Sequence, residues 1–365
     1  MFDHIIGNEQ AKAYLRRTAE RRTVGNSLLF AGPDGIGKSL FAEAFAKLLI
    51  CQNDPHGHHR HKIEAGNHPD IRIYRPEGKV GMHSIASMRN FNQEVYLAPF
   101  EAKWKVFIIH DADRMLTYSA NSLLKTFEEP ASDAVIILLS SAPAALLPTI
   151  LSRCRTIHFQ PIAQEEITEF ISQRCGKPHT EASVVASMAQ GSIGQALRLA
   201  KEGSHPLRSF LLDILSKRSF SSYKELSAAA ASIAGHIETS KKEIEGDVRT
   251  LLMRGAGTDL SATQKQSIEK EIEGAVSMHA TQEAHALLEV LLAWYRDMHL
   301  MQENGELAYL MHTDSIAACE HAFKAGGIQP LESVQKTIAD ARLSIERSTS
   351  LNICFENLFL KLNFL

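Results

Sequence analysis

A short glycine-rich loop that ends in a lysine carries the clearest chemical signal in this chain. Residues 32–39 read Gly-Pro-Asp-Gly-Ile-Gly-Lys-Ser and fit the pattern G-x-x-x-x-G-K-[ST]. Glycines let backbone N–H groups turn inward around a phosphate, and the lysine adds a positive charge. We therefore predict a site for ATP and Mg²⁺ whose phosphate-binding residues are Gly32, Gly35, Gly37 and Lys38 and whose metal-side residue is Ser39.

The elements around this loop must form a buried strand and a helix. Residues 28–31 are apolar, and the apolar residues between 40 and 49 recur at helical spacing. Further apolar runs lie at 106–109, 135–139 and 156–159, separated by stretches of helical character. Continuous apolar strands that alternate with helices are typical of a parallel sheet buried on both faces, which predicts an α/β domain.

The acidic pair that a hydrolysing ATPase needs is incomplete. The second apolar run is followed by His110, Asp111 and Ala112. If the strand ends at Ile109, His110 takes the metal-side position and Asp111 the position that polarises water. If the register is shifted by one residue, Asp111 serves the metal and Ala112 stands where the base belongs. Because Mg²⁺ prefers hard oxygen ligands, both registers make Asp111 part of a degenerate Walker B motif and predict slow or absent hydrolysis.

Length and composition indicate a multidomain protein. The chain has 365 residues, more than one ordinary core holds, and strand signals stop after Pro161. We predict an α/β nucleotide-binding domain at 1–160, a small helical lid at 161–204 and an all-helical domain at 205–365.

Charge and cysteine content narrow the possible classes of function. The net charge is −3, which excludes a global basic field, so DNA contacts are expected to be shared with partner chains. Five scattered cysteines fit a reducing compartment better than a disulfide framework. No apolar run approaches the roughly 20 residues that span a bilayer, and the N-terminus lacks the pattern of a secretory signal. The expected location is the cytoplasm, without membrane contact.

Several longer motifs resemble those of a known family. They are Gly-Asn-His-Pro-Asp at 66–70, Asp-Ala-Asp-Arg-Met at 111–115, Asn-Ser-Leu-Leu-Lys-Thr-Phe-Glu-Glu-Pro at 121–130 and Leu-Pro-Thr-Ile-Leu-Ser-Arg-Cys at 147–154. Together they are similar to bacterial clamp-loader subunits of DNA polymerase III, which are AAA+ P-loop proteins. The resemblance implies an AAA+ domain, a helical lid and a C-terminal collar domain. It covers residues 1 to about 200 and is supported beyond them mainly by helical character.

The resemblance also implies a role for Arg153. In this family, the arginine of the Ser-Arg-Cys motif reaches across a subunit interface to the γ-phosphate of a neighbour's ATP. Such an arginine finger stabilises charge on the transferred phosphoryl group. Arg153 occupies this position, and a local ion pair is the alternative interpretation.

Two departures favour the delta-prime type of subunit over the ATP-hydrolysing gamma/tau type. Gly194 stands where gamma-type chains carry an arginine that senses the γ-phosphate, and the acidic pair is degraded. The implied partners are the gamma/tau and delta subunits, the sliding clamp and, through the assembled complex, primed DNA. Whether the chain is itself an enzyme stays open, although the complex that it would serve is a nucleotidyltransferase.

A zinc site is the weakest of the metal hypotheses. Related subunits hold Zn²⁺ with four cysteines before the His-Pro-Asp segment, but this chain retains one of them. A Cys/His set could be formed by Cys51, His56, His58 and His61. Their spacing is not that of a known closed site, and neighbouring histidines cannot all face one ion, so the sequence favours a loop without metal.

Three other functions remain open at this point. The chain could be a gamma/tau-type motor that hydrolyses ATP by itself, which a Lys38-dependent ATPase rate would show. It could be a P-loop phosphotransferase, which would consume ATP only with a small acceptor. It could also be an interaction scaffold that binds no nucleotide.

Overall fold

A computed structural model describes residues 2, 4–21, 24–54, 57–78, 80–202, 206–217, 219–255, 262–306, 310–312, 315–324 and 328–364. The chain forms two compact units. The first comprises Met1–Ala200 and Arg249–Ala275, and the second comprises Lys201–Val248 and Val276–Leu365. The predicted division into three domains at 160 and 204 stays a prediction.

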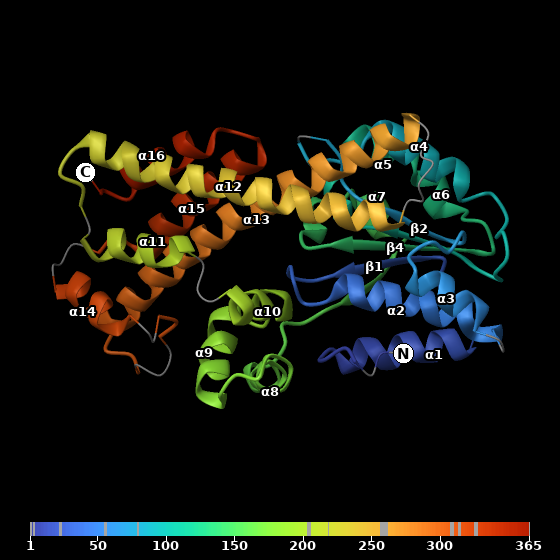
Figure 1. Cartoon of the computed structure of the whole chain (residues 1–365), viewed down its shortest axis with the longest axis horizontal. Helices are drawn as coiled ribbons and strands as arrows, with labels where there is room; N and C mark the ends of the chain where they lie inside the picture. Colours follow the sequence, from blue (N-terminus) through green and yellow to red (C-terminus); the bar gives the residue numbers. More distant parts are fainter. Residues whose placement is uncertain are drawn as a thin grey trace. The chain divides into compact units, whose positions relative to one another are not determined.

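The first unit is built on a five-stranded parallel sheet (Figure 1). Its strands are β1 (Ser27–Ala31), β2 (Ile71–Tyr74), β3 (Lys105–Ile109), β4 (Ala134–Ser140) and β5 (Arg155–His158). The order is β2-β3-β4-β1-β5, and every neighbouring pair is parallel. The sequence predicted β1, β3, β4 and β5. It missed β2, because Ile-Arg-Ile-Tyr is a short edge strand with two exposed residues and lacks a continuous apolar run.

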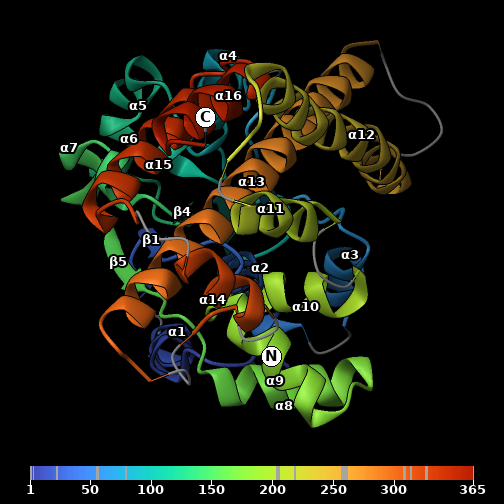
Figure 2. The same ribbon diagram turned by 90° about the vertical axis from the view of Figure 1, so that its left-hand side faces the viewer.

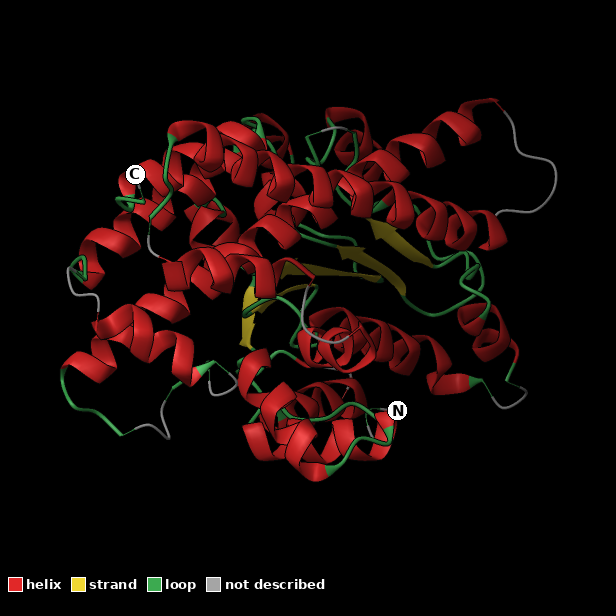
Figure 3. Ribbon diagram, turned by 60° about the vertical axis from the view of Figure 1, so that its left-hand side comes forward, coloured by secondary structure: helices red, strands yellow, loops and turns green. Residues whose placement is uncertain are grey.

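Both faces of the sheet are buried under helices, as Figure 3 shows for the strands drawn in yellow. One face packs against α1 (Glu9–Arg21) and α2 (Lys38–Ile50). The other packs against α4 (Ile85–Glu94), α5 (Thr117–Ser122), α6 (Leu124–Glu128) and α7 (Pro148–Leu151). The short helix α3 (His58–Glu64) has no buried residue. The predicted α/β class with a parallel sheet is confirmed.

Three helices follow the sheet and pack around a small core of their own (Figure 2). They are α8 (Gln164–Cys175), α9 (His179–Ala189) and α10 (Ile193–Glu202). Glycines in the left-handed conformation allow the turns: Gly176 ends α8 with φ +66°, and Gly191 follows α9 with φ +83°. We call α8–α10 the lid.

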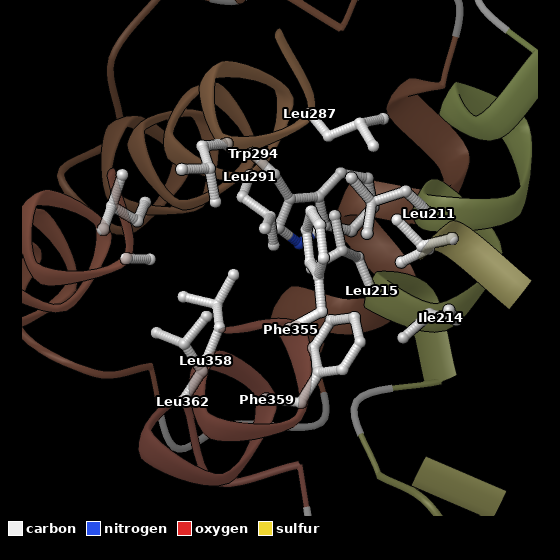
Figure 4. Packing of buried hydrophobic residues seen from close by; sticks show 14 of the residues in the cluster. Leu211, Ile214, Leu215, Leu287, Leu291, Trp294, Phe355, Leu358, Phe359 and Leu362 are labelled. Carbon is white, nitrogen blue, oxygen red and sulfur yellow. The ribbon is translucent and has the colours of Figure 1, made fainter. Parts of the chain in front are cut away.

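The second unit is helical throughout its described part. Two long helices contribute to it, α12 (Tyr223–Gly255) and α13 (Ala262–Gln302). The others are α11 (Pro206–Lys217), α14 (Ile316–Lys324), α15 (Leu331–Glu346) and α16 (Leu351–Lys361). Figure 4 shows its core, in which Trp294 of α13 lies among Leu215 and Phe355. Within the described part of the chain, no helix is both long enough and apolar enough to cross a membrane.

Candidate nucleotide site

The phosphate loop lies where the sequence places it, between β1 and α2. Gly35 and Gly37 have φ of +73° and +96°, a region that costs other residues free energy. The N–H of Gly32 donates to the carbonyl of Ser140, which fastens the loop to β4. Ser39 is half-buried in the first turn of α2. The loop thus presents the N-terminus of α2, a place that favours anions.

Lys38 is turned back onto its own loop. Its Nζ donates to the carbonyl oxygens of Gly32 at 2.5 Å and Pro33 at 2.7 Å, and lies 3.6 Å from Oδ1 of Asp34. Burial lowers the pKa of Lys38, while the nearby carboxylates of Asp34 and Asp111 oppose that shift. A phosphate entering the loop would replace these carbonyl contacts with charged ones, which are stronger.

Strand β3 ends at Ile109, which is the boundary that the first of the two registers assumes. His110 is the first residue beyond the strand, and its N–H donates to Tyr74 O at 2.9 Å. Burial, Arg75 and His83 lower the pKa of His110 to about 3, so the imidazole is neutral at pH 7. In the register that ends the strand at Ile109, this neutral imidazole takes the position of a Mg²⁺-ligating carboxylate.

Asp111 follows in a left-handed conformation with φ +46°. Burial raises its pKa to about 6, and the neighbouring Asp34 and Asp113 add to the shift. A carboxyl group with this pKa could accept a proton near neutral pH. The acidic pair of a hydrolysing ATPase is nevertheless incomplete, since the residue before Asp111 is His110.

Two residues at this edge of the sheet were not identified from the sequence. Ser140, the last residue of β4, is fully buried, and its Oγ donates to Oδ1 of Asp113 at 2.5 Å. The pair places a polar network at the carboxyl ends of β3 and β4, near the phosphate loop. The signal available in the sequence was a serine directly after the apolar run 135–139, at the same edge as Asp111.

The lid contacts the phosphate loop directly. The N–H of Gly194 donates to the carbonyl of Gly35 at 2.9 Å. A Cβ atom on Gly35 would lie 2.2 Å from Oγ of Ser192, and one on Gly194 would lie 3.3 Å from Cα of Gly35. Gly194 therefore stands beside the loop, at the place where the resemblance puts a sensor arginine, and its lack of a side chain permits this close approach.

Arg153 makes its hydrogen bonds to nearby residues and not to the phosphate loop or the Ser140–Asp113 pair. It follows α7 and precedes β5, and its side chain is 32% exposed. The guanidinium donates to Thr149 O at 2.8 Å and Ser152 Oγ at 3.3 Å, and forms an ion pair with Glu128. The half-exposed ion pair is easily exchanged for another anion, because such pairs contribute little stability.

Of the four predicted zinc ligands, the three that the structure describes do not form a close group of ligand atoms. His56 lies outside the described residues. Cys51 begins a short 3-10 turn after α2, and His58 and His61 lie on α3. Among the described residues, the group with three ligand atoms close together is a different one, formed by His59, His68 and Glu101.

The topology and the site together define the class of protein. A P-loop after β1, a polar network at the ends of β3 and β4 and a helical lid against the loop are the features of a P-loop α/β domain. Residues 7–163 match the model of a protein family described as DNA polymerase III, delta subunit.

Individual relatives agree with that match. The chain is 34% identical over 194 residues to DNA polymerase III subunit delta' of Bacillus subtilis (strain 168), covering 51% of this chain and 57% of the relative. It is 31% identical over 192 residues to the delta' subunit of Pseudomonas aeruginosa, covering 50% and 54%. It is 27% identical over 209 residues to subunit tau of Bacillus subtilis, covering 54% and 37%.

The resemblance to delta-prime subunits, and less closely to tau, is confirmed. The chain spans little more than half the length of the delta-prime relatives that it matches. The family match ends at residue 163, before the lid begins.

Proposed function

We propose that this chain is a delta-prime-like subunit of a DNA polymerase III clamp loader. In that role it would join gamma/tau and delta subunits in the cytoplasm and help to place a sliding clamp on primed DNA. The observation that carries the proposal is the contrast within one site. The phosphate loop with Lys38 is complete, whereas the residue after β3 is the neutral His110.

This contrast separates nucleotide binding from hydrolysis. Backbone N–H groups, Lys38 and Ser39 suffice to bind ATP with Mg²⁺, because they contact the phosphates and one metal position. Hydrolysis also needs a carboxylate on the metal and a base for the attacking water. With His110 in place of the metal-binding carboxylate, the isolated chain would bind ATP and hydrolyse it slowly.

Arg153 would be the contribution of this chain to catalysis. It would reach the γ-phosphate of ATP bound to the next subunit in the ring. Its ion pair with Glu128 holds the guanidinium at the molecular surface until a stronger anion replaces the carboxylate. A phosphate offers the same two-pronged contact with more charge.

The test is a reconstituted clamp-loading reaction with the partner subunits. We expect Arg153→Ala to reduce clamp-stimulated ATP hydrolysis by the complex at least about tenfold, since arginine fingers contribute large factors. Lys38→Ala should have a small effect. Arg89→Ala, which removes an exposed arginine from α4, is the matched control.

The reverse pattern, with Lys38→Ala severe and Arg153→Ala harmless, would contradict the trans-acting finger. A Lys38-dependent ATPase rate of the isolated chain would favour a gamma/tau-type motor instead. ATP consumption that appears only with a small acceptor would favour a phosphotransferase.

A further inference from the structure

Three side chains from separate segments meet near the N-terminal ends of β2 and β3, away from the phosphate loop. His59 lies on α3, His68 lies in the turn before β2, and Glu101 lies in the loop before β3. Their side chains are 17%, 1% and 20% exposed. The cluster is therefore largely shielded from water.

The distances between the nitrogen and oxygen atoms are short. Nδ1 of His59 lies 2.9 Å from Nε2 of His68 and 3.8 Å from Oε1 of Glu101. Nε2 of His68 lies 3.4 Å from the same oxygen. Three such atoms around one point at about 2.1 Å, the usual zinc–ligand distance, would be separated by roughly 3.4 Å in a tetrahedron. The observed triangle has this size.

The backbone around the cluster is fixed by two aspartates. Asp54 accepts hydrogen bonds from the N–H groups of His58 at 2.9 Å and His59 at 2.8 Å, which secures the start of α3. Asp70 is fully buried and accepts from the N–H of Glu101 at 2.9 Å. The backbone segments that carry His59 and Glu101 are thus fixed by contacts that do not involve a metal, which supports a preformed binding site.

One atom of the cluster lacks the partner that its burial calls for. Oε1 of Glu101 is buried and accepts no hydrogen bond, whereas Oε2 accepts one from Nζ of Lys62 at 2.6 Å. A buried carboxylate oxygen without a donor is costly. A cation between this oxygen and the two imidazoles would satisfy it.

We propose that His59, His68 and Glu101 bind a zinc ion. Two imidazole nitrogens and one carboxylate oxygen form a ligand set that zinc accepts, with a fourth position left for water. The ion would join α3 and the turn before β2, which are neighbours in the sequence, to the loop before β3, which follows about 30 residues later. This inference does not depend on the proposed function.

The competing arrangement is a hydrogen bond between the two rings. His68 now accepts from the N–H of Asp70 through Nδ1 at 3.1 Å, so the proton of a neutral ring is on Nε2, facing His59. Zinc would replace that proton. The proton would be released or move to Nδ1, and in the second case the hydrogen bond to Asp70 would be lost.

The experiment is metal titration of the full chain after dialysis against a chelator. Co²⁺ reports a four-coordinate site through its visible absorption, and Zn²⁺ added afterwards should displace it. We expect one equivalent to bind and Zn²⁺ to raise the midpoint of thermal unfolding, because only the folded state holds the site. His59→Ala and Glu101→Gln should each weaken Zn²⁺ binding at least about 100-fold, more than the loss of an outer-shell partner.

His58→Ala is the matched control, since it removes the exposed neighbour of His59 and should leave affinity unchanged. The proposal fails if the wild-type chain binds no Zn²⁺. It fails equally if all variants bind alike, which would indicate adventitious binding by exposed histidines. Circular dichroism of each variant without metal confirms that the comparison is made between folded proteins.

Discussion

Three aspartates and one lysine share the edge of the candidate nucleotide site. Asp34 lies beside Lys38, and both Asp34 and Asp113 raise the pKa of Asp111. Burial raises it further, because a charged carboxylate loses its hydration. The site therefore carries an electrostatic cost in the absence of a cation, and Mg²⁺ bound with a nucleotide would relieve it.

The electrostatic cost at Asp111 can be measured as a change in the free energy of unfolding. Its folded-state pKa of about 6 lies above the ordinary 3.8, so the ionised group opposes folding above pH 6. We expect Asp111→Asn to raise the free energy of unfolding at pH 7.5 by roughly 1–3 kcal/mol. The gain should shrink as the pH falls from about 6 to about 4 and disappear below about pH 3, where the carboxyl is protonated in both the folded and the unfolded state.

Urea unfolding at pH 7.5, 6 and 4 measures this difference. Asparagine suits the left-handed backbone at this position, so the substitution adds no strain. Asp133→Asn, in an exposed loop, is the control and should change little. An equal gain at all three pH values would show that charge is not the cause.

At the scale of elements, the lid depends on two left-handed turns that differ in their surroundings. A Cβ atom on Gly191 would lie 2.4 Å from Cβ of Pro161, whereas one on Gly176 would meet no atom within 4 Å. The turn at Gly191 packs against Pro161, in the segment that connects β5 to the lid. The N–H of Ile162 also donates there, to Gly191 O at 2.9 Å.

Alanine at these two positions separates backbone strain from packing. Gly176→Ala should cost about 1 kcal/mol through the left-handed conformation alone. Gly191→Ala should cost roughly 2–4 kcal/mol, because the added methyl group also displaces Pro161. Hydrogen exchange of the amides in α8–α10 should accelerate more in the second variant. Equal effects in both variants would mean that Pro161 moves aside without cost.

At the scale of the whole molecule, α13 contributes to both compact units. Its first part, up to Ala275, belongs with the sheet, and the rest belongs to the helical unit. The N–H of Gly78 donates to Lys270 O at 2.8 Å, and Arg75 lies 3.5 Å from Glu271. Gly274 permits this contact, since a Cβ atom there would lie 2.3 Å from Pro76 O.

Replacing Gly274 with alanine should therefore weaken the contact. Glycine-to-alanine changes inside helices normally stabilise by about 0.5–1 kcal/mol, and Gly235→Ala in α12, which has open space around it, should do so. Gly274→Ala should instead lower the free energy of unfolding by roughly 1–3 kcal/mol and speed hydrogen exchange at Gly78. If Gly274→Ala stabilises the protein, the loop at Pro76 must move aside without a cost in free energy.

Local patterns in the sequence determined much of this protein. The spacing of Gly32 to Ser39 and the apolar runs identified the loop, four of the five strands and the α/β class, because these signals lie within one element. The resemblance of Ser-Arg-Cys to a family motif singled out Arg153, whose role stays a prediction. The sequence did not predict strand β2, because an edge strand that is half exposed has no continuous apolar run.

The tertiary structure alone decided which distant residues meet. It ended β3 at Ile109, directly before His110, and it paired Ser140 with Asp113. It brought Gly194 onto Gly35 and gathered His59 with Glu101. Such contacts join residues tens to more than a hundred positions apart, and their formation depends on how the elements pack, which the spacing within a single element does not encode.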